Sequence, residues 1–146
     1  MSDNKYILVV NGPNLNLLGK RQPEIYGATS LEDINRELAT QLPPDFALIT
    51  KQSNCEGEII DNIHEAGFDP DCAGIILNAG AYSHYSLAIA DAIAAVNTPV
   101  VEVHLSNIYA REEYRHKSVI APVCRGSISG FGPLSYSLAL KAILEL

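Results

Sequence analysis

Several kinds of protein are excluded by what this sequence lacks. Its three cysteines, Cys55, Cys72 and Cys124, are an odd number without C-x-x-C spacing, which favours neither a disulfide framework nor a zinc site. No apolar run approaches the roughly 18 residues that a membrane-spanning helix needs. We therefore expect reduced thiols, no metal and no membrane segment.

Positive charge is also scarce. Ten lysines and arginines face 17 aspartates and glutamates, which gives a net charge of -7. Nucleic acids and anionic membranes bind through basic patches, so neither is an expected partner. A small anionic substrate is compatible with this net charge, because arginines can make the electrostatic potential positive inside a pocket. The first strand begins too early to leave room for a signal peptide, so the expected location is the cytoplasm.

The 146 residues alternate between strand-like apolar runs and helical patterns. Ser30 with Asp33, and Ser53 with Glu56, have the spacing of capping boxes at helix starts, and Gly67 is expected to close the second helix. The predicted strands are 6–10, 46–50, 74–78, 99–104 and 119–124; the predicted helices are 31–42, 53–67, 84–96 and 134–145.

This alternation predicts one α/β domain over residues 1–146. Continuous apolar strands separated by helices indicate a parallel sheet covered on both faces. Five strands in this length fit a flavodoxin-like, doubly wound sheet, in which ligands bind beyond the carboxyl ends of the strands. Polar clusters follow three predicted strands, at 11–14, 78–84 and 102–107. Each cluster alone is typical of a turn or cap, but together they predict a site at one edge of the sheet.

Glu102 and His104 are two positions apart in a strand, so both side chains point to the same face. A carboxylate beside a histidine can fix its tautomer and favour its protonated form, which makes His104 a candidate general acid. A histidine that only satisfies a hydrogen bond is the alternative. His64 and His116 have no comparable surroundings and are interpreted as surface residues.

The sixteen residues "GPNLNLLGKRQPEIYG", 12–27, show no regular period and carry Arg21 and Tyr26 near their end. Irregular loops of this length are often functional lids. Tyrosine has an unperturbed pKa of about 10 and is a poor base near neutral pH. A cation at about 4 Å contributes about 4 kcal/mol at an effective dielectric near 20, which is enough to make tyrosinate accessible. Where an arginine and a tyrosine lie close together outside such a loop, their contact more often serves packing than catalysis.

Four runs of the sequence resemble one family along essentially the whole chain. They are "GPNLNLLGKRQPEIYG", "QSNCEGEIIDNIHEAG", "LNAGAYSHYSLAIADAI" and "EVHLSNIYAREEYRHKSVIAPVCRGSISGFGPLSY". The family is type II 3-dehydroquinate dehydratase. The resemblance implies a flavodoxin-like fold, no metal or organic cofactor, and a homododecamer built as a tetramer of trimers. It also implies conversion of 3-dehydroquinate to 3-dehydroshikimate in the shikimate pathway.

The resemblance assigns catalytic roles residue by residue. Tyr26 removes a proton from C2 of the substrate, and Arg21 is the cation beside it, so the loop of about 14–27 is an active-site lid. Asn14 stabilises the enolate that develops. His104 protonates the leaving C1 hydroxyl, and Glu102 orients His104.

The resemblance also assigns substrate-binding positions. Arg115 suits the substrate carboxylate because its planar fork binds such groups in bidentate fashion. Asp91 is expected to reach a neighbouring subunit's site, although from the sequence alone it reads as a solvated helix residue. Arg111 is assigned a structural or lid-contacting role. The remaining expected binding residues are Asn78, His84, Leu105 and Ser106.

Three other functions share parts of this pattern. A flavodoxin-like module that binds a flavin or another small ligand is the main alternative, but it should carry a Ser/Thr-rich phosphate loop where this chain has Asn11-Gly-Pro-Asn14. A receiver domain needs clustered acidic residues at the ends of its first and third strands. A Schiff-base dehydratase needs a lysine, and none of the five lysines lies at the predicted edge.

Overall fold

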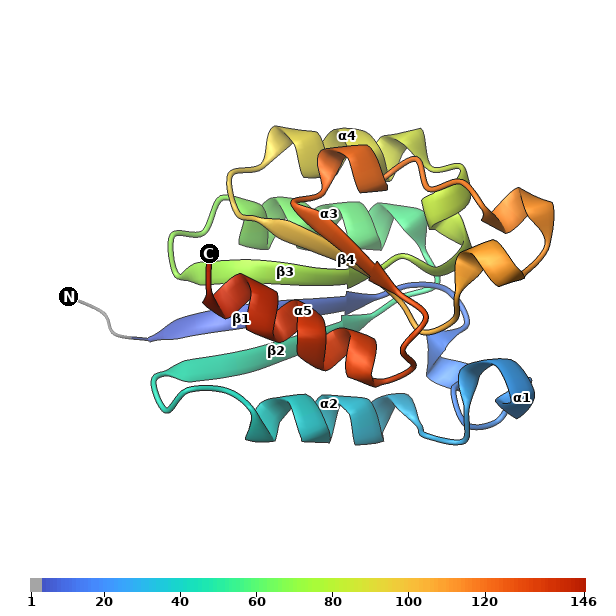
Figure 1. Ribbon diagram of the computed structural model, residues 1–146. Helices are drawn as coiled ribbons and strands as arrows, with labels where there is room; N and C mark the ends of the chain where they lie inside the picture. Colours follow the sequence, from blue (N-terminus) through green and yellow to red (C-terminus); the bar gives the residue numbers. More distant parts are fainter. Residues whose placement is uncertain (1–3) are drawn as a thin grey trace.

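The computed structural model describes residues 4–146, which form one parallel sheet with helices on both faces (Figure 1). The sheet order is β2-β1-β3-β4-β5, with every pair parallel, as in flavodoxin-like folds. The predicted α/β, doubly wound architecture is confirmed. The strands are β1 Lys5–Asn11, β2 Phe46–Gln52, β3 Cys72–Asn78, β4 Val100–His104 and β5 Gly126–Ser129.

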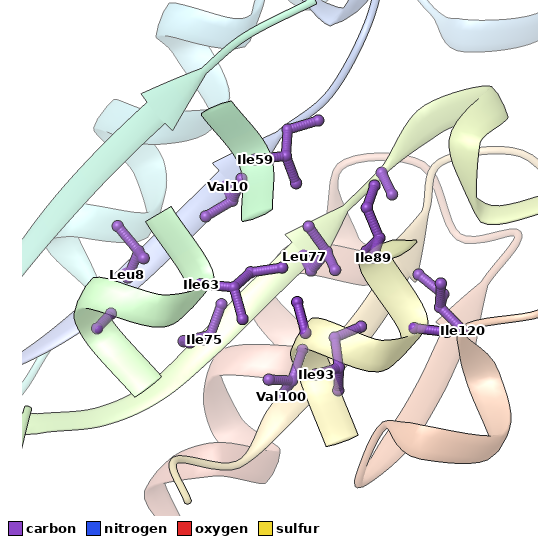
Figure 2. Packing of buried hydrophobic residues seen from close by; sticks show 14 of the residues in the cluster. Leu8, Val10, Ile59, Ile63, Ile75, Leu77, Ile89, Ile93, Val100 and Ile120 are labelled. Carbon is purple, nitrogen blue, oxygen red and sulfur yellow. The ribbon is translucent and has the colours of Figure 1, made fainter. Parts of the chain in front are cut away.

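Strand β1 shows how the sequence builds two cores. Leu8 and Val10 pack on one side of the sheet and Ile7 and Val9 on the other, because successive strand residues point to opposite faces. Each such side chain, fully buried, contributes roughly 1.5–3 kcal/mol. One layer holds α3 Glu56–Gly67 and α4 Leu87–Ala95, and its packing is shown in Figure 2; the other holds α2 Leu31–Thr40 and α5 Leu134–Leu144.

The helix starts were predicted with mixed success. Ser30 and Asp33 form the expected capping box on α2. The capping box predicted at Ser53 is wrong, since α3 begins one residue after Cys55. Ser53 lies too early to cap: its hydroxyl accepts from the Cys55 amide at 2.9 Å and donates to Glu58 at 2.5 Å.

The end of α3 brings it close to α4. Gly67 is the last residue of α3, as predicted, but its φ is not in the left-handed region. A Cβ atom there would lie 2.3 Å from the Cβ of Val96. Glycine is therefore required by the close packing of the two segments rather than by backbone geometry.

The segment 119–124, predicted as the last strand, is not a strand. It contains the short 3-10 helix Ala121–Val123, and β5 follows it at Gly126. Pro122 lacks an amide hydrogen for a sheet ladder, and the Ser118 hydroxyl accepts from the Ala121 amide at 3.1 Å. Ile120, fully buried, packs into the α3/α4 core. The apolar pattern here reflects a buried turn.

The loop predicted as irregular contains two short helices, 3-10 Leu15–Leu17 and α1 Pro23–Tyr26. Pro23 at the first helical position and Gly27 after the last favour a single turn there. The helix predicted at 84–96 begins later, at the start of α4. The 3-10 helix Gly80–His84 precedes it, and Ser86 caps α4 by accepting from the Ile89 amide. Among residues 4–146, no helix is long and apolar enough to span a membrane.

Candidate active site

The polar clusters lie together beyond the carboxyl ends of β1, β3 and β4 (Figure 1). The ends of β1 and β3 lie close together, since the Gly12 amide donates to the Asn78 carbonyl at 2.7 Å. A Cβ atom on Gly12 would lie 2.7 Å from the Ala79 carbonyl oxygen, so only glycine allows the two strand ends to meet. This places the pocket at the switch point between β1 and β3.

The pocket has a volume of about 140 Å³, the scale of a small metabolite. Arg111 also lines the pocket, together with the predicted Arg21 and Arg115. No lysine lines it in the described part of the chain, and among residues 4–146 no three His, Cys, Asp or Glu side chains are placed to hold a metal ion. The predicted residues that line the pocket are Asn14, Arg21, Tyr26, Asn78, His84, His104, Leu105, Ser106 and Arg115.

The Tyr26 hydroxyl lies between two guanidinium groups. It accepts hydrogen bonds from Arg21 Nη2 at 2.9 Å and from Arg111 Nη1 at 2.8 Å. The carbon atoms of the two guanidinium groups lie 4.8 Å and 5.1 Å from the Tyr26 ring centroid. Two cationic donors therefore point at one oxygen, and such charge-assisted hydrogen bonds are stronger than neutral ones.

Arg111 contacts the lid, as predicted, but it does so at the tyrosine oxygen itself. Its Nη1 atom also donates to the Ser106 hydroxyl at 3.4 Å, so it joins the 12–27 loop to the segment after β4. The 85 positions between Tyr26 and Arg111 hide this contact in the sequence. The sequence indicated this contact only by having a second pocket arginine, Arg111, close to Arg115 in the motif after β4.

The 12–27 loop holds strained backbone. Asn14 has φ of 69° and Gln22 has φ of 40°, both in the left-handed region that side chains other than glycine disfavour. Such residues cost about 1–3 kcal/mol each and gather at functional sites. Leu15 and Leu18, both buried, anchor the start of the loop in the α2/α5 core.

Glu102 and His104 form the predicted pair on one face of β4. The His104 Nε2–H donates to Glu102 at 2.7 Å, and Glu102 is fully buried. This contact leaves Nδ1 as the ring nitrogen available to the pocket. The serines at 118 and 127, which the sequence did not single out, donate to the Glu102 carboxylate at 2.6 Å and 2.9 Å.

These contacts keep Glu102 ionised although it is buried. Burial alone raises the pKa of a carboxyl group. The hydrogen bond and the positive charge of His104 oppose that effect, as do the Ser118 and Ser127 hydroxyls, and together they hold the pKa of Glu102 below its ordinary value. A buried carboxylate that accepts from Nε2 fixes the orientation of the His104 ring, as a proton-transfer role requires.

His84 complements His104 as a neutral partner. The two rings are stacked, with centroids 6.2 Å apart. Burial lowers the pKa of His84, and the nearby charges of His104 and Arg115 lower it further, while its bond to the Lys117 carbonyl acts in the opposite direction. In the neutral form, Nδ1–H donates to that carbonyl at 2.9 Å. Nε2 is then a hydrogen-bond acceptor, suited to a substrate hydroxyl.

Two predicted residues lie outside the pocket. Glu102 is behind His104, consistent with an orienting role. Asp91 is exposed on α4 and does not line this chain's own pocket. The interpretation of His64 and His116 as surface residues is confirmed by their exposure.

The Arg115 guanidinium at the pocket rim is oriented by two neighbours. Its Nε donates to Glu112 at 2.6 Å, and its carbon lies 5.1 Å from the Tyr114 ring centroid. The bond to Glu112 raises the pKa of Arg115 above its already high value. A fixed positive charge therefore stands at the edge of the pocket.

The chain was compared with known protein families and with curated proteins. The family model described as Dehydroquinase class II matches residues 5–144. The chain is 57% identical over 139 residues to a 3-dehydroquinate dehydratase of Exiguobacterium sp., covering 95% of this chain and 94% of the relative. It is 58% identical over 143 residues to a 3-dehydroquinate dehydratase of Caldicellulosiruptor bescii, covering 97% and 98%.

Solved structures agree with this assignment. The type II dehydroquinase from Propionibacterium acnes superposes with a TM-score of 0.90 at 41% identity, covering 98% of each chain. The type II dehydroquinase from Butyrivibrio crossotus gives a TM-score of 0.89 at 44% identity, covering 97% of this chain and 98% of the other. The flavin-binding alternative is not favoured. With the fold, the pocket and the relatives in agreement, the chain belongs to the class II dehydroquinase family.

Proposed function

We propose that this protein is a hydro-lyase that removes water from 3-dehydroquinate to give 3-dehydroshikimate, a step of the shikimate pathway. The relatives that match along the whole chain are 3-dehydroquinate dehydratases. The observation that carries the proposal is the Tyr26 hydroxyl held by Arg21 and Arg111 in the pocket that also contains His104. The pocket thus holds a cation-stabilised base and a carboxylate-supported acid.

The reaction begins at the lid. Tyrosinate at Tyr26 takes a proton from C2, which is acidified by the neighbouring C3 ketone, and the electron pair moves to the ketone oxygen as an enolate. Asn14, at the pocket wall, supplies a polar group that stabilises the enolate, directly or through a held water. In this proposal residues 1–146 form one catalytic domain with 14–27 as its lid.

The second step completes the elimination. His104 donates a proton to the C1 hydroxyl, water leaves, and the enolate electrons form the new double bond conjugated with the ketone. Glu102 holds His104 in the donating orientation. Arg115 with Leu105 and Ser106 binds the substrate carboxylate, and Asn78 and His84 bind ring hydroxyls. No metal or organic cofactor takes part in the proposed steps.

A direct assay tests the proposal. Purified protein with 3-dehydroquinate and no added cofactor should develop the ultraviolet absorbance of the enone product. His104→Ala should lose dehydration more than it loses proton exchange at C2, because enolate formation precedes loss of water. Deuterium incorporation at C2, followed by mass spectrometry, measures this. Equal loss of both would remove His104 from the second step.

The proposal extends to a homododecamer, arranged as a tetramer of trimers, in which Asp91 completes a neighbouring subunit's site. Asp91 is exposed and outside its own chain's pocket. Tyr85 and Leu87, on the same stretch of chain, are exposed by 63% and 67%, and these two neighbouring apolar side chains support a contact surface beside Asp91. The cytoplasmic location expected from the sequence stays a prediction.

Mixed assemblies test the role of Asp91. Tyr26→Phe protein and Asp91→Asn protein, unfolded together and reassembled, should form some sites with an intact Tyr26 and an intact Asp91. Activity should then exceed the sum of the separately refolded parents. Mixed assemblies with only the summed activity would place Asp91 outside the neighbour's site.

A further inference from the structure

A chain of three buried polar side chains extends from the pocket into the interior, and the proposed reaction uses only one of them, Asn78. The Asn78 Nδ2 atom donates to the Tyr136 hydroxyl at 2.9 Å, and that hydroxyl donates to Asn11 Oδ1 at 2.6 Å. Tyr136 and Asn11 are fully buried and Asn78 is 3% exposed. The three residues come from α5, the end of β1 and the end of β3. Of the three, Asn78 alone lines the pocket.

The direction of this chain follows from its donors and acceptors. The Gly80 amide donates to Asn78 Oδ1 at 3.1 Å, so the oxygen of the Asn78 amide faces the 80–84 turn and its nitrogen faces Tyr136. The phenol must then accept from Asn78, and its single hydrogen is free to go to Asn11. If the Asn78 amide were flipped, its NH2 group would face the Gly80 N–H, and two hydrogen-bond donors would point at each other.

We propose that Tyr136 is a positioning residue that fixes the side-chain amide of Asn78 and so determines which hydrogen-bonding group Asn78 presents to the substrate. With one Nδ2 hydrogen bound by Tyr136 and Oδ1 turned toward the Gly80 amide, the second Nδ2 hydrogen is the donor that Asn78 has left for the pocket. Through this hydrogen Asn78 acts as a donor to an oxygen acceptor on the substrate ring. This inference rests on the proposed function for the identity of the substrate.

Burial makes the arrangement rigid. Burial raises the pKa of Tyr136 well above its ordinary value, and the bond from Asn78 only partly offsets this, so the phenol stays protonated. Loss of a partner inside the protein leaves a buried polar group unsatisfied. The free-energy cost of that unsatisfied group exceeds the net contribution of the hydrogen bond to stability. The amide of Asn78 thus has one low-energy orientation.

The test compares Tyr136→Phe with Tyr6→Phe. Tyr6 also donates its hydroxyl to a side chain, Asp69 at 2.8 Å, but from the start of β1 at the opposite end of the sheet. Both variants keep the ring and lose a hydrogen bond, so both should melt at lower temperature. Only Tyr136→Phe should raise KM for 3-dehydroquinate, by about tenfold, with a smaller change in kcat. A KM within twofold of that of Tyr6→Phe would overturn the proposal.

A readout without substrate separates this inference from the proposed function. In 15N-resolved NMR spectra, Tyr136→Phe should shift the Asn78 side-chain NH2 signals and speed their exchange with water, whereas Tyr6→Phe should leave them unchanged. If Tyr136→Phe does not fold, Asn11→Ala removes the acceptor of the phenol hydrogen and should shift the same signals. Unchanged Asn78 signals in the folded variant would overturn the role of Tyr136. A wild-type protein inactive on 3-dehydroquinate would instead overturn the proposed function.

Discussion

The two halves of the proposed chemistry stand on very different structural supports. The base, Tyr26, is in a one-turn helix in which no residue is buried. The acid, His104, ends a strand whose five residues are all buried and which pairs with β3 and β5. The lid holds its tyrosine through two arginines, whereas the strand holds its histidine through a carboxylate with two further donors.

The reaction and the stability of the fold are therefore coupled more closely at His104 than at Tyr26. Changes in the lid that keep its apolar groups should alter the reaction while leaving the folded state nearly intact, because Leu15 and Leu18 are buried in the α2/α5 core and Tyr26 packs against it through its ring. Changes at Glu102 act inside the sheet, so they should affect reaction and stability together. Three predictions follow from this contrast.

The largest effect is expected at Tyr26. Tyr26→Phe removes the base and keeps the ring, so turnover should fall by about 10²–10⁴-fold, the usual contribution of a general base, or more. The melting temperature should change little, as no residue of α1 is buried. Steady-state kinetics and thermal unfolding measure the two quantities. Tyr109→Phe, at a residue 66% exposed on the surface, is the matched control. Near-normal turnover would remove Tyr26 from the reaction.

The next effect concerns the two arginines. Arg21→Gln and Arg111→Gln each remove one charged hydrogen bond to the Tyr26 oxygen, so each should lower kcat/KM by roughly 10- to 150-fold, the equivalent of about 1.5–3 kcal/mol. Arg36→Gln, which breaks an exposed ion pair with Asp33 on α2, should leave kcat/KM unchanged. A near-normal kcat/KM for Arg111→Gln would restrict that residue to structural contact with the lid.

The smallest effect should appear in stability at Glu102. Its folded pKa lies below the ordinary value of 4.5, so its stabilising contribution is full above that value and is lost as pH falls through the folded pKa. Glu102→Gln should therefore lower the free energy of unfolding by about 1–3 kcal/mol at pH 7, and the gap from wild type should narrow as pH falls below about 4. Urea unfolding at several pH values measures this. A gap that is constant from pH 7 to pH 3 would mean that the charge of Glu102 does not stabilise the fold.

Much of the fold could be read from local patterns. Four of the predicted strands are present, with their polar ends at one edge of the sheet, because strand patterns are properties of short stretches and the alternation of strands with helices favours a parallel sheet. The fifth strand was misplaced, since a buried turn around Pro122 and a strand show the same apolar composition. The Glu102–His104 pair was predictable for the same local reason, a separation of two in a strand.

Local patterns specify the alternation of elements, the loop that carries Arg21 and Tyr26, and the order of polar clusters after the strands. They do not specify that Arg111, 85 positions from Tyr26, reaches the same oxygen, which follows from the folded arrangement. Folding likewise brings Tyr136, 58 positions from Asn78 and 125 from Asn11, between those two amides in the interior. Periodicity specifies which face of an element is buried, but it carries no information on which distant side chain meets another across a core. That choice is made by the packing of the assembled sheet and helices, where most buried donors and acceptors find a partner.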